Sequence, residues 1–68
     1  MLLLSEYFRK DGASAEVLAI DGFYAIMYYN NEDMLCEVVE FKNNTLLQVE
    51  ETAEDWALEV TKEPIVLC

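Results

Sequence analysis

The order of apolar and polar residues divides the chain into a strand-rich part followed by a helical part. Asp21-Gly22 separates two runs, residues 15–20 and 23–29, that are rich in β-branched and aromatic residues. Asp-Gly between such runs is a strong signal for a two-residue hairpin, in which we expect positive φ at both turn positions. A polar cluster then leads into a third strand-type run, residues 34–41. Together, the three runs predict an antiparallel meander.

The two turns set the register of the predicted strands. Ile20 pairs with Phe23 across the first turn, and Tyr29 pairs with Met34 across the second. An antiparallel sheet with one solvent-exposed face should alternate apolar and polar residues, whereas this register gives two apolar faces. One face carries Leu18, Ile20, Phe23, Ala25, Met27, Tyr29, Met34, Cys36 and Val38, with Glu16 and Glu40 at its margins. The other carries Ala15, Val17, Ala19, Tyr24, Ile26, Tyr28, Leu35, Val39 and Phe41, with Glu37 as its one charge.

From Asn44 onward the apolar residues recur with the period of a helix. We therefore expect an amphipathic helix over residues 44–61. Thr45 and Gln48 have the spacing of a capping box at its start, and Lys62 and Pro64 mark its end. The predicted buried stripe consists of Leu46, Val49, Ala53, Trp56, Ala57 and Val60.

The predicted fold is an α+β domain, in which a three- or four-stranded antiparallel meander is followed by one C-terminal helix packed on one sheet face. The meander occupies residues 14–42. Residues 1–12 form a strand or a short helix, of which we favour the strand. Residues 62–68 form a tail that is either a short extra strand or an arm on a neighbouring molecule.

A single helix can cover only one face of the sheet, so we expect a second copy of the chain to cover the other. Tyrosine suits such a contact because its ring is buried while its hydroxyl finds a partner. The sequence therefore predicts a homodimer. The residues expected at its interface are Val17, Tyr24, Ile26, Tyr28, Leu35 and Val39.

Charge narrows the possible partners of this domain. Of the 68 residues, 14 are acidic and four are basic, which gives a net charge of −10. Such a protein is repelled by a phosphate backbone and by an anionic membrane surface, so we expect no direct nucleic-acid or membrane binding.

We also expect no leader peptide, since Glu6 interrupts the apolar start of the chain. The spacing of Cys36 and Cys68 matches neither a disulfide framework nor a zinc site, so we expect a reducing, cytosolic compartment. Cys36 lies beside Leu35 and Glu37, which do not favour a thiolate, so we expect a buried structural thiol and not a reactive one.

The sequence contains few residues that could carry out catalysis or bind a metal. The absence of His excludes Ser-His-Asp and Cys-His catalysis. We expect a non-enzymatic protein with no cofactor and no metal. The predicted helix carries an acidic surface that we interpret as a solvated face; the alternative is a mimic of nucleic acid that inhibits a host enzyme. Its residues are Glu50, Glu51, Glu54, Asp55 and Glu59.

Four segments resemble small proteins of tailed phages that infect marine cyanobacteria: residues 5–7, the hairpin strand with its Gly-aromatic start, the strand-type run 37–41 and, above all, residues 51–58, Glu-Thr-Ala-Glu-Asp-Trp-Ala-Leu. In that family the helix is similar to Ala-Glu-Asp-Ala-Ala-Glu-Asn-Trp, followed by an aliphatic residue, Leu and Gly. Glu59 stands here in place of that Gly, which implies a longer helix. The resemblance implies phage origin, action in the host bacterial cytoplasm and a possible host protein partner, and it supplies no catalytic residue.

Overall fold

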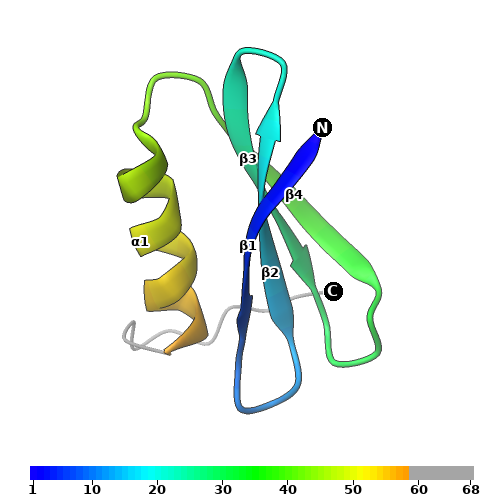
Figure 1. The fold of residues 1–68 in the computed structure, drawn as a ribbon. Coiled ribbons are helices and arrows are strands. Elements are labelled where there is room, and N and C mark those ends of the chain that lie inside the picture. The colour runs from blue at the N-terminus through cyan, green and yellow to red at the C-terminus, as the bar shows by residue number, and fades with distance from the viewer. Residues whose placement is uncertain (59–68) are drawn as a thin grey trace.

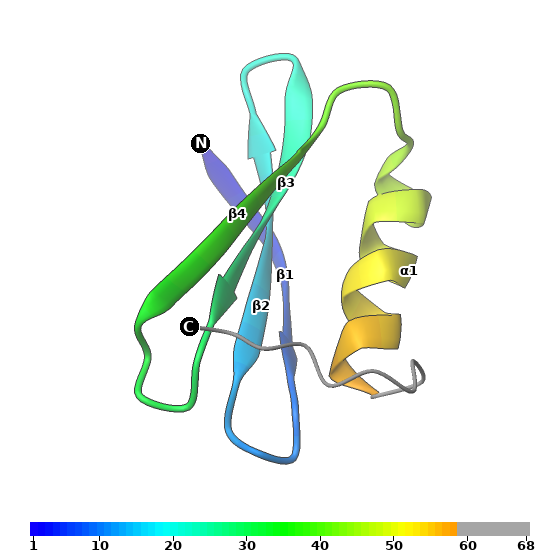
Figure 2. The same cartoon turned by 180° about the vertical axis from the view of Figure 1, so that it is seen from behind.

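The protein has four strands followed by one helix, as seen in a computed structural model that describes residues 1–58 (Figure 1). The strands form one antiparallel sheet in the order β1-β2-β3-β4, and α1 lies on one side of it (Figure 2). This confirms the predicted α+β class and the strand favoured near the N-terminus. The elements are β1 (Leu2–Phe8), β2 (Ser14–Ile20), β3 (Phe23–Tyr29), β4 (Leu35–Phe41) and α1 (Leu46–Ala57).

The hairpin between β2 and β3 has the predicted register. Ile20 lies opposite Phe23, and every later pair follows without a break to Ser14 opposite Tyr29. Gly22 has a φ of 88°, whereas Asp21 is not among the residues with positive φ. The expectation of positive φ at both turn residues is therefore wrong. A positive φ at the second position alone is the pattern of a type II turn, in which Gly is favoured.

The register between β3 and β4 differs from the prediction by two residues. Ile26 lies opposite Val39, and a bulge follows at Tyr28 and Tyr29. The connecting loop is longer than predicted because the side chain of Asn30 organises it. The Asn30 Oδ1 atom accepts hydrogen bonds from the backbone N–H groups of Glu32 (2.8 Å) and Met34 (3.0 Å). Because the shift is an even number of residues, the side of the sheet on which most β4 residues lie is unchanged.

The capping box predicted at the start of α1 is present. The Gln48 backbone N–H donates to the hydroxyl of Thr45, and the Thr45 backbone N–H donates to the side-chain oxygen of Gln48. The helix ends at Ala57, with Leu58 as its C-cap, and is therefore shorter than predicted. The predictions for Glu59, Val60 and the 62–68 tail lie outside the described residues.

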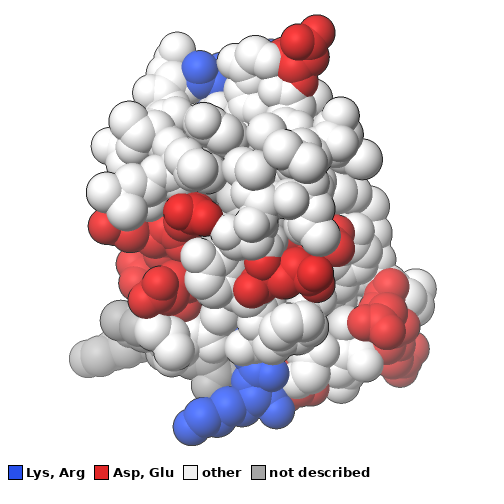
Figure 3. All heavy atoms as spheres, in the orientation of Figure 1, with Lys and Arg blue, Asp and Glu red and all other residues white. Residues whose placement is uncertain are grey.

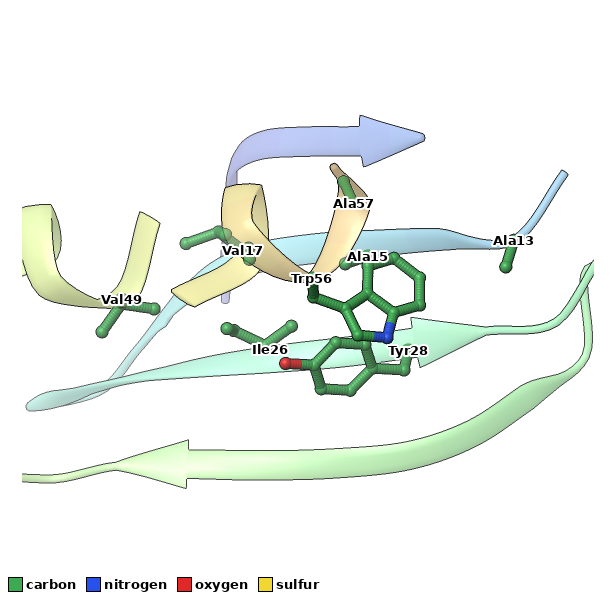
Figure 4. Close-up of a cluster of buried hydrophobic side chains, with 9 residues drawn as sticks. Ala13, Ala15, Val17, Ile26, Tyr28, Val49, Trp56 and Ala57 are labelled. Atoms are coloured by element: carbon green, nitrogen blue, oxygen red, sulfur yellow. The ribbon is translucent and has the colours of Figure 1, made fainter. Parts of the chain in front are cut away.

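The core lies between α1 and the face of the sheet that α1 covers (Figure 4). Val49, Ala53 and Trp56 of the predicted helical stripe are all buried there. The indole ring of Trp56 packs edge-on against Tyr28, with 4.9 Å between ring centroids, and the Arg9 guanidinium lies 5.0 Å from the indole. Trp56 is thus the anchor of the helix on the sheet, as its position in the sequence suggested.

Candidate functional site: the open face of the sheet

The helix covers the sheet face that the sequence analysis assigned to the dimer interface. Val17 and Ile26 are fully buried in the core, and Tyr28 is 7% exposed. Tyr24 and Val39 pack against the same core and are partly buried. The assignment of these residues to an interface between copies is therefore wrong, because the chain's own helix already occupies that face.

Leu35 departs from this pattern because of the bulge in β4. It lies opposite Tyr29, whose neighbours in the sheet face away from the helix. Leu35 is 48% exposed and does not belong to the core cluster. It remains available for contact with a partner, although on the other face of the sheet.

We call the side of the sheet opposite α1 the open face, and its residues follow from the strand register. They form four rows across the strands. From the end nearest the β1–β2 turn, the rows are Phe8, Ser14, Tyr29 and Leu35; Glu6, Glu16, Met27 and Val38; Leu3, Leu18, Ala25 and Glu40; and Ile20, Phe23 and Lys42.

Side chains at the centre of the open face are buried, whereas several around the centre are exposed to solvent. Leu18 is 4% exposed and Ala25 is fully buried. Around this centre, apolar residues remain exposed to solvent: Leu3 is 46% exposed, Val38 is 49% exposed and Phe8 is 69% exposed. An exposed apolar surface of this kind on one side of a small sheet is typical of a protein-interaction site.

The open face also carries charge. Glu6 on β1 lies directly opposite Glu16 on β2. Lys42 follows β4, and its Nζ atom lies 5.5 Å from the centroid of the Phe23 ring. A hydrogen bond with Glu16, then burial, and then the negative charge of Glu16 raise the pKa of Tyr29 above its ordinary 10.0. The sequence analysis missed Lys42, although extending the strand alternation one residue beyond Phe41 would have placed it on this face.

The acidic surface predicted on the helix lies partly against β1. Glu50 is half-buried, and its carboxylate accepts a hydrogen bond of 2.6 Å from the hydroxyl of Ser5. Burial, followed by the charge of Glu50, raises the pKa of Tyr7 above 10.0. Glu51, Glu54 and Asp55 are exposed, as a solvated acidic face requires, and Glu59 is outside the described residues. Figure 3 shows acidic atoms in several patches, one at the top and others across the middle and lower part of the view, with basic atoms at its top and bottom.

Two features of the described residues bear on catalysis: the grouping of metal-ligating side chains and a surface hollow. No group of three or more Asp, Glu, Cys or His side chains within residues 1–58 is placed to hold a metal ion. A shallow hollow beside the β2–β3 turn is lined by Ile20, Gly22 and Phe23 together with neighbouring strand residues, and it contains no carboxylate. Among the described residues that line it, Tyr24 carries the one ionisable side chain.

Cys36 differs from the expectation of a buried thiol. The residue is half-buried, and the part of the chain that the structure describes contains no free cysteine. The cysteines thus no longer support the argument for a reducing compartment.

The fold and the open face define this protein as a small α+β protein with a one-helix layer and an accessible sheet face. In comparisons with protein-family models, curated proteins and solved structures, no significant match to the chain is found. The family resemblance noted in the sequence therefore stays a prediction. Among residues 1–58, no helix has the length and hydropathy needed to cross a membrane.

Proposed function

We propose that the protein is a small, acidic, non-enzymatic interaction module that acts as a homodimer closed over the open face of each copy. The observation that carries this proposal is the set of exposed apolar side chains around a closed centre, represented by Leu3 and Val38. Removing apolar surface from water is the main driving force of most protein association. The homodimer expected from the sequence is retained, with its interface moved to the opposite face of the sheet.

The size of the open face favours a reversible dimer. Four strands spaced about 4.8 Å apart, each seven residues long at about 3.3 Å per residue, give a face of about 450 Å². Two such faces bury about 900 Å², which is below the range of about 1,200–2,000 Å² typical of stable specific interfaces and lies in the range of weak, transient ones. We therefore expect the monomer and the dimer to exchange at micromolar concentrations.

Sedimentation equilibrium of the full chain tests the dimer. The wild-type mass should rise from the 7.8 kDa of one chain toward twice that value as the concentration increases from about 10 μM to about 1 mM. Val38→Glu places a charge on the open face and should keep the chain monomeric. Leu47→Glu is the matched control, because Leu47 is 65% exposed on the helix and away from the open face. A wild-type chain that stays monomeric throughout, or a Val38→Glu variant that dimerises normally, would contradict the proposal.

The acidic mimic of nucleic acid is the alternative function, and salt separates the two. A mimic binds a basic partner through charge, so its affinity falls as salt is added. Self-association of a chain with a net charge of −10 should instead strengthen, because salt screens the repulsion between the copies. Phage origin and action in the host bacterial cytoplasm belong to the same proposal and rest on the resemblance of residues 51–58.

A further inference from the structure

Lys42 and the paired carboxylates of Glu6 and Glu16 lie at opposite corners of the open face, and a third carboxylate, Glu40, lies on β4 between the two corners. Lys42 is beside Phe23, at the end of the face nearest the β2–β3 turn and on the side of β4. Glu6 and Glu16 lie toward the other end, on β1 and β2. Within residues 1–58, Lys42 is the one basic residue that we place on this face. A line from Lys42 to the two carboxylates therefore runs diagonally across the sheet.

The pair of carboxylates is unfavourable in an isolated chain. Glu6 and Glu16 are directly opposite each other on adjacent antiparallel strands. Like charges in this position destabilise a sheet, whereas opposite charges stabilise it. The pair becomes favourable when a cation from another molecule lies between the two carboxylates.

The strand register gives the separation of the two charged corners. Along the strands, the row of Phe23 and the row of Met27 are four residues apart, which corresponds to about 13 Å. Across the sheet, β4 lies two to three strand spacings from β1 and β2, which corresponds to about 12 Å. The two separations are nearly equal, so the diagonal lies at about 45° to the strands.

A two-fold axis that lies in the open face, perpendicular to this diagonal, exchanges the two corners. It passes close to Ala25, a small and fully buried residue near the centre of the face. Rotation about such an axis turns the strands of the second copy by about 90°. Orthogonal crossing is one of the two common ways in which β-sheets pack face to face.

We propose that the homodimer is an orthogonal sandwich of two open faces, in which Lys42 of each copy contacts Glu6 and Glu16 of the other. This inference rests on the proposed homodimer and adds its geometry. The same rotation places Phe23 of one copy over Leu3 and Leu18 of the other, so apolar contacts accompany each charged contact. An isologous interface contains both contacts twice, once on each side of the axis.

Charge reversal with full-length chains tests this arrangement. Lys42→Glu and Glu16→Lys should each weaken the dimer at least about tenfold, because each reversal replaces an attraction with a repulsion at two symmetry-related contacts. The double variant with both changes should dimerise within about threefold of wild type. An equimolar mixture of the two single variants should form a heterodimer. In this heterodimer, the substituted position 42 of one copy and the substituted position 16 of the other carry opposite charges and contact each other on one side of the axis. On the other side of the axis, the unchanged Lys42 and Glu16 contact each other.

Matched controls remove the effect of net charge. Glu51→Lys changes the charge as Glu16→Lys does, and Lys10→Glu changes it as Lys42→Glu does, but Glu51 lies on α1 and Lys10 lies in the exposed β1–β2 turn, beyond the rows of the open face. These two variants should dimerise within about threefold of wild type. Sedimentation equilibrium measures all the dissociation constants, and circular dichroism verifies that each variant is folded.

The outcomes separate this inference from the proposed function. Loss of dimer in both single variants, with recovery in the double variant and in the mixture, supports the diagonal contact. If Val38→Glu abolishes the dimer while the charge reversals leave it unchanged, the open face is the interface and the orthogonal arrangement is wrong. If the wild-type chain never dimerises, both proposals are wrong.

Discussion

Replacing Trp56 with alanine should remove most of the stability of this protein. The residue is 4% exposed, and it contacts Tyr28 and the guanidinium of Arg9. A buried Trp or Phe replaced by Ala costs about 3–5 kcal/mol, and loss of the aromatic and cation–π contacts places Trp56→Ala in the upper half of that range. Proteins of this size are stable by about 3–10 kcal/mol, so the change leaves a largely unfolded or marginal population.

Urea unfolding followed by circular dichroism measures the effect. Fluorescence is unsuitable because Trp56 is the single tryptophan of the chain. Trp56→Phe should cost less than about 1.5 kcal/mol, because it keeps a ring and loses an indole N–H that has no hydrogen-bond acceptor within the described residues. Leu47→Ala, on the exposed side of the same helix, should cost less than about 0.5 kcal/mol. A Trp56→Ala protein within about 1 kcal/mol of wild type would refute the anchoring role of Trp56.

Three further substitutions test the fold in different places. Thr45→Ala removes the N-cap and should lower the free energy of unfolding by about 1 kcal/mol in urea titrations; an unchanged value would mean that the capping box contributes nothing. Ile26→Glu, at a residue that the sequence analysis assigned to the dimer interface, should abolish cooperative unfolding, because Ile26 is fully buried under the helix. Burial, followed by the charge of Glu37, raises the pKa of Tyr28 above 10.0. The unfolded state then loses the Tyr28 proton first as the pH rises, so stability present below about pH 10 is lost above it, and Tyr28→Phe should reduce this loss. An equally steep alkaline loss in Tyr28→Phe would contradict that cause.

The parts of the fold that were predictable are those set by local signals. Asp21-Gly22 fixed the register of β2 and β3, because a two-residue connection leaves no freedom in the pairing of the flanking strands. Thr45 and Gln48 marked the helix start, because their hydrogen bonds involve residues only three positions apart.

The second hairpin shows where local reasoning fails. The loop after β3 was predicted as four residues, but the side chain of Asn30 accepts two backbone hydrogen bonds and Asp33 takes a φ of 62°. These interactions make the loop one residue longer and introduce the bulge that turns Leu35 to the open face. Competition between alternative loop conformations is decided by such side-chain bonds, which composition alone does not reveal.

The choice of the covered face was not predictable from hydrophobicity, because both faces are apolar. The number of acidic residues distinguishes the two faces. The face under the helix includes Glu37 near its margin, whereas the open face includes Glu6, Glu16 and Glu40. Burying an unpaired carboxylate is costly, so the helix covers the face that carries fewer carboxylates. The pairing of β1, which brings Glu6 into the sheet, was needed to make this difference clear.

The central claim is that α1 occupies one face of the sheet and a second copy occupies the other. Backbone amide chemical shifts of a ¹⁵N-labelled chain, followed while the sample is diluted from about 1 mM to about 10 μM, test it most directly. The account predicts concentration-dependent shifts at Leu18, Ala25 and Val38 of the open face, and constant shifts at Val49 and Glu51 of the helix. Shifts that stay constant across the open face, or that change on the helix instead, would contradict it.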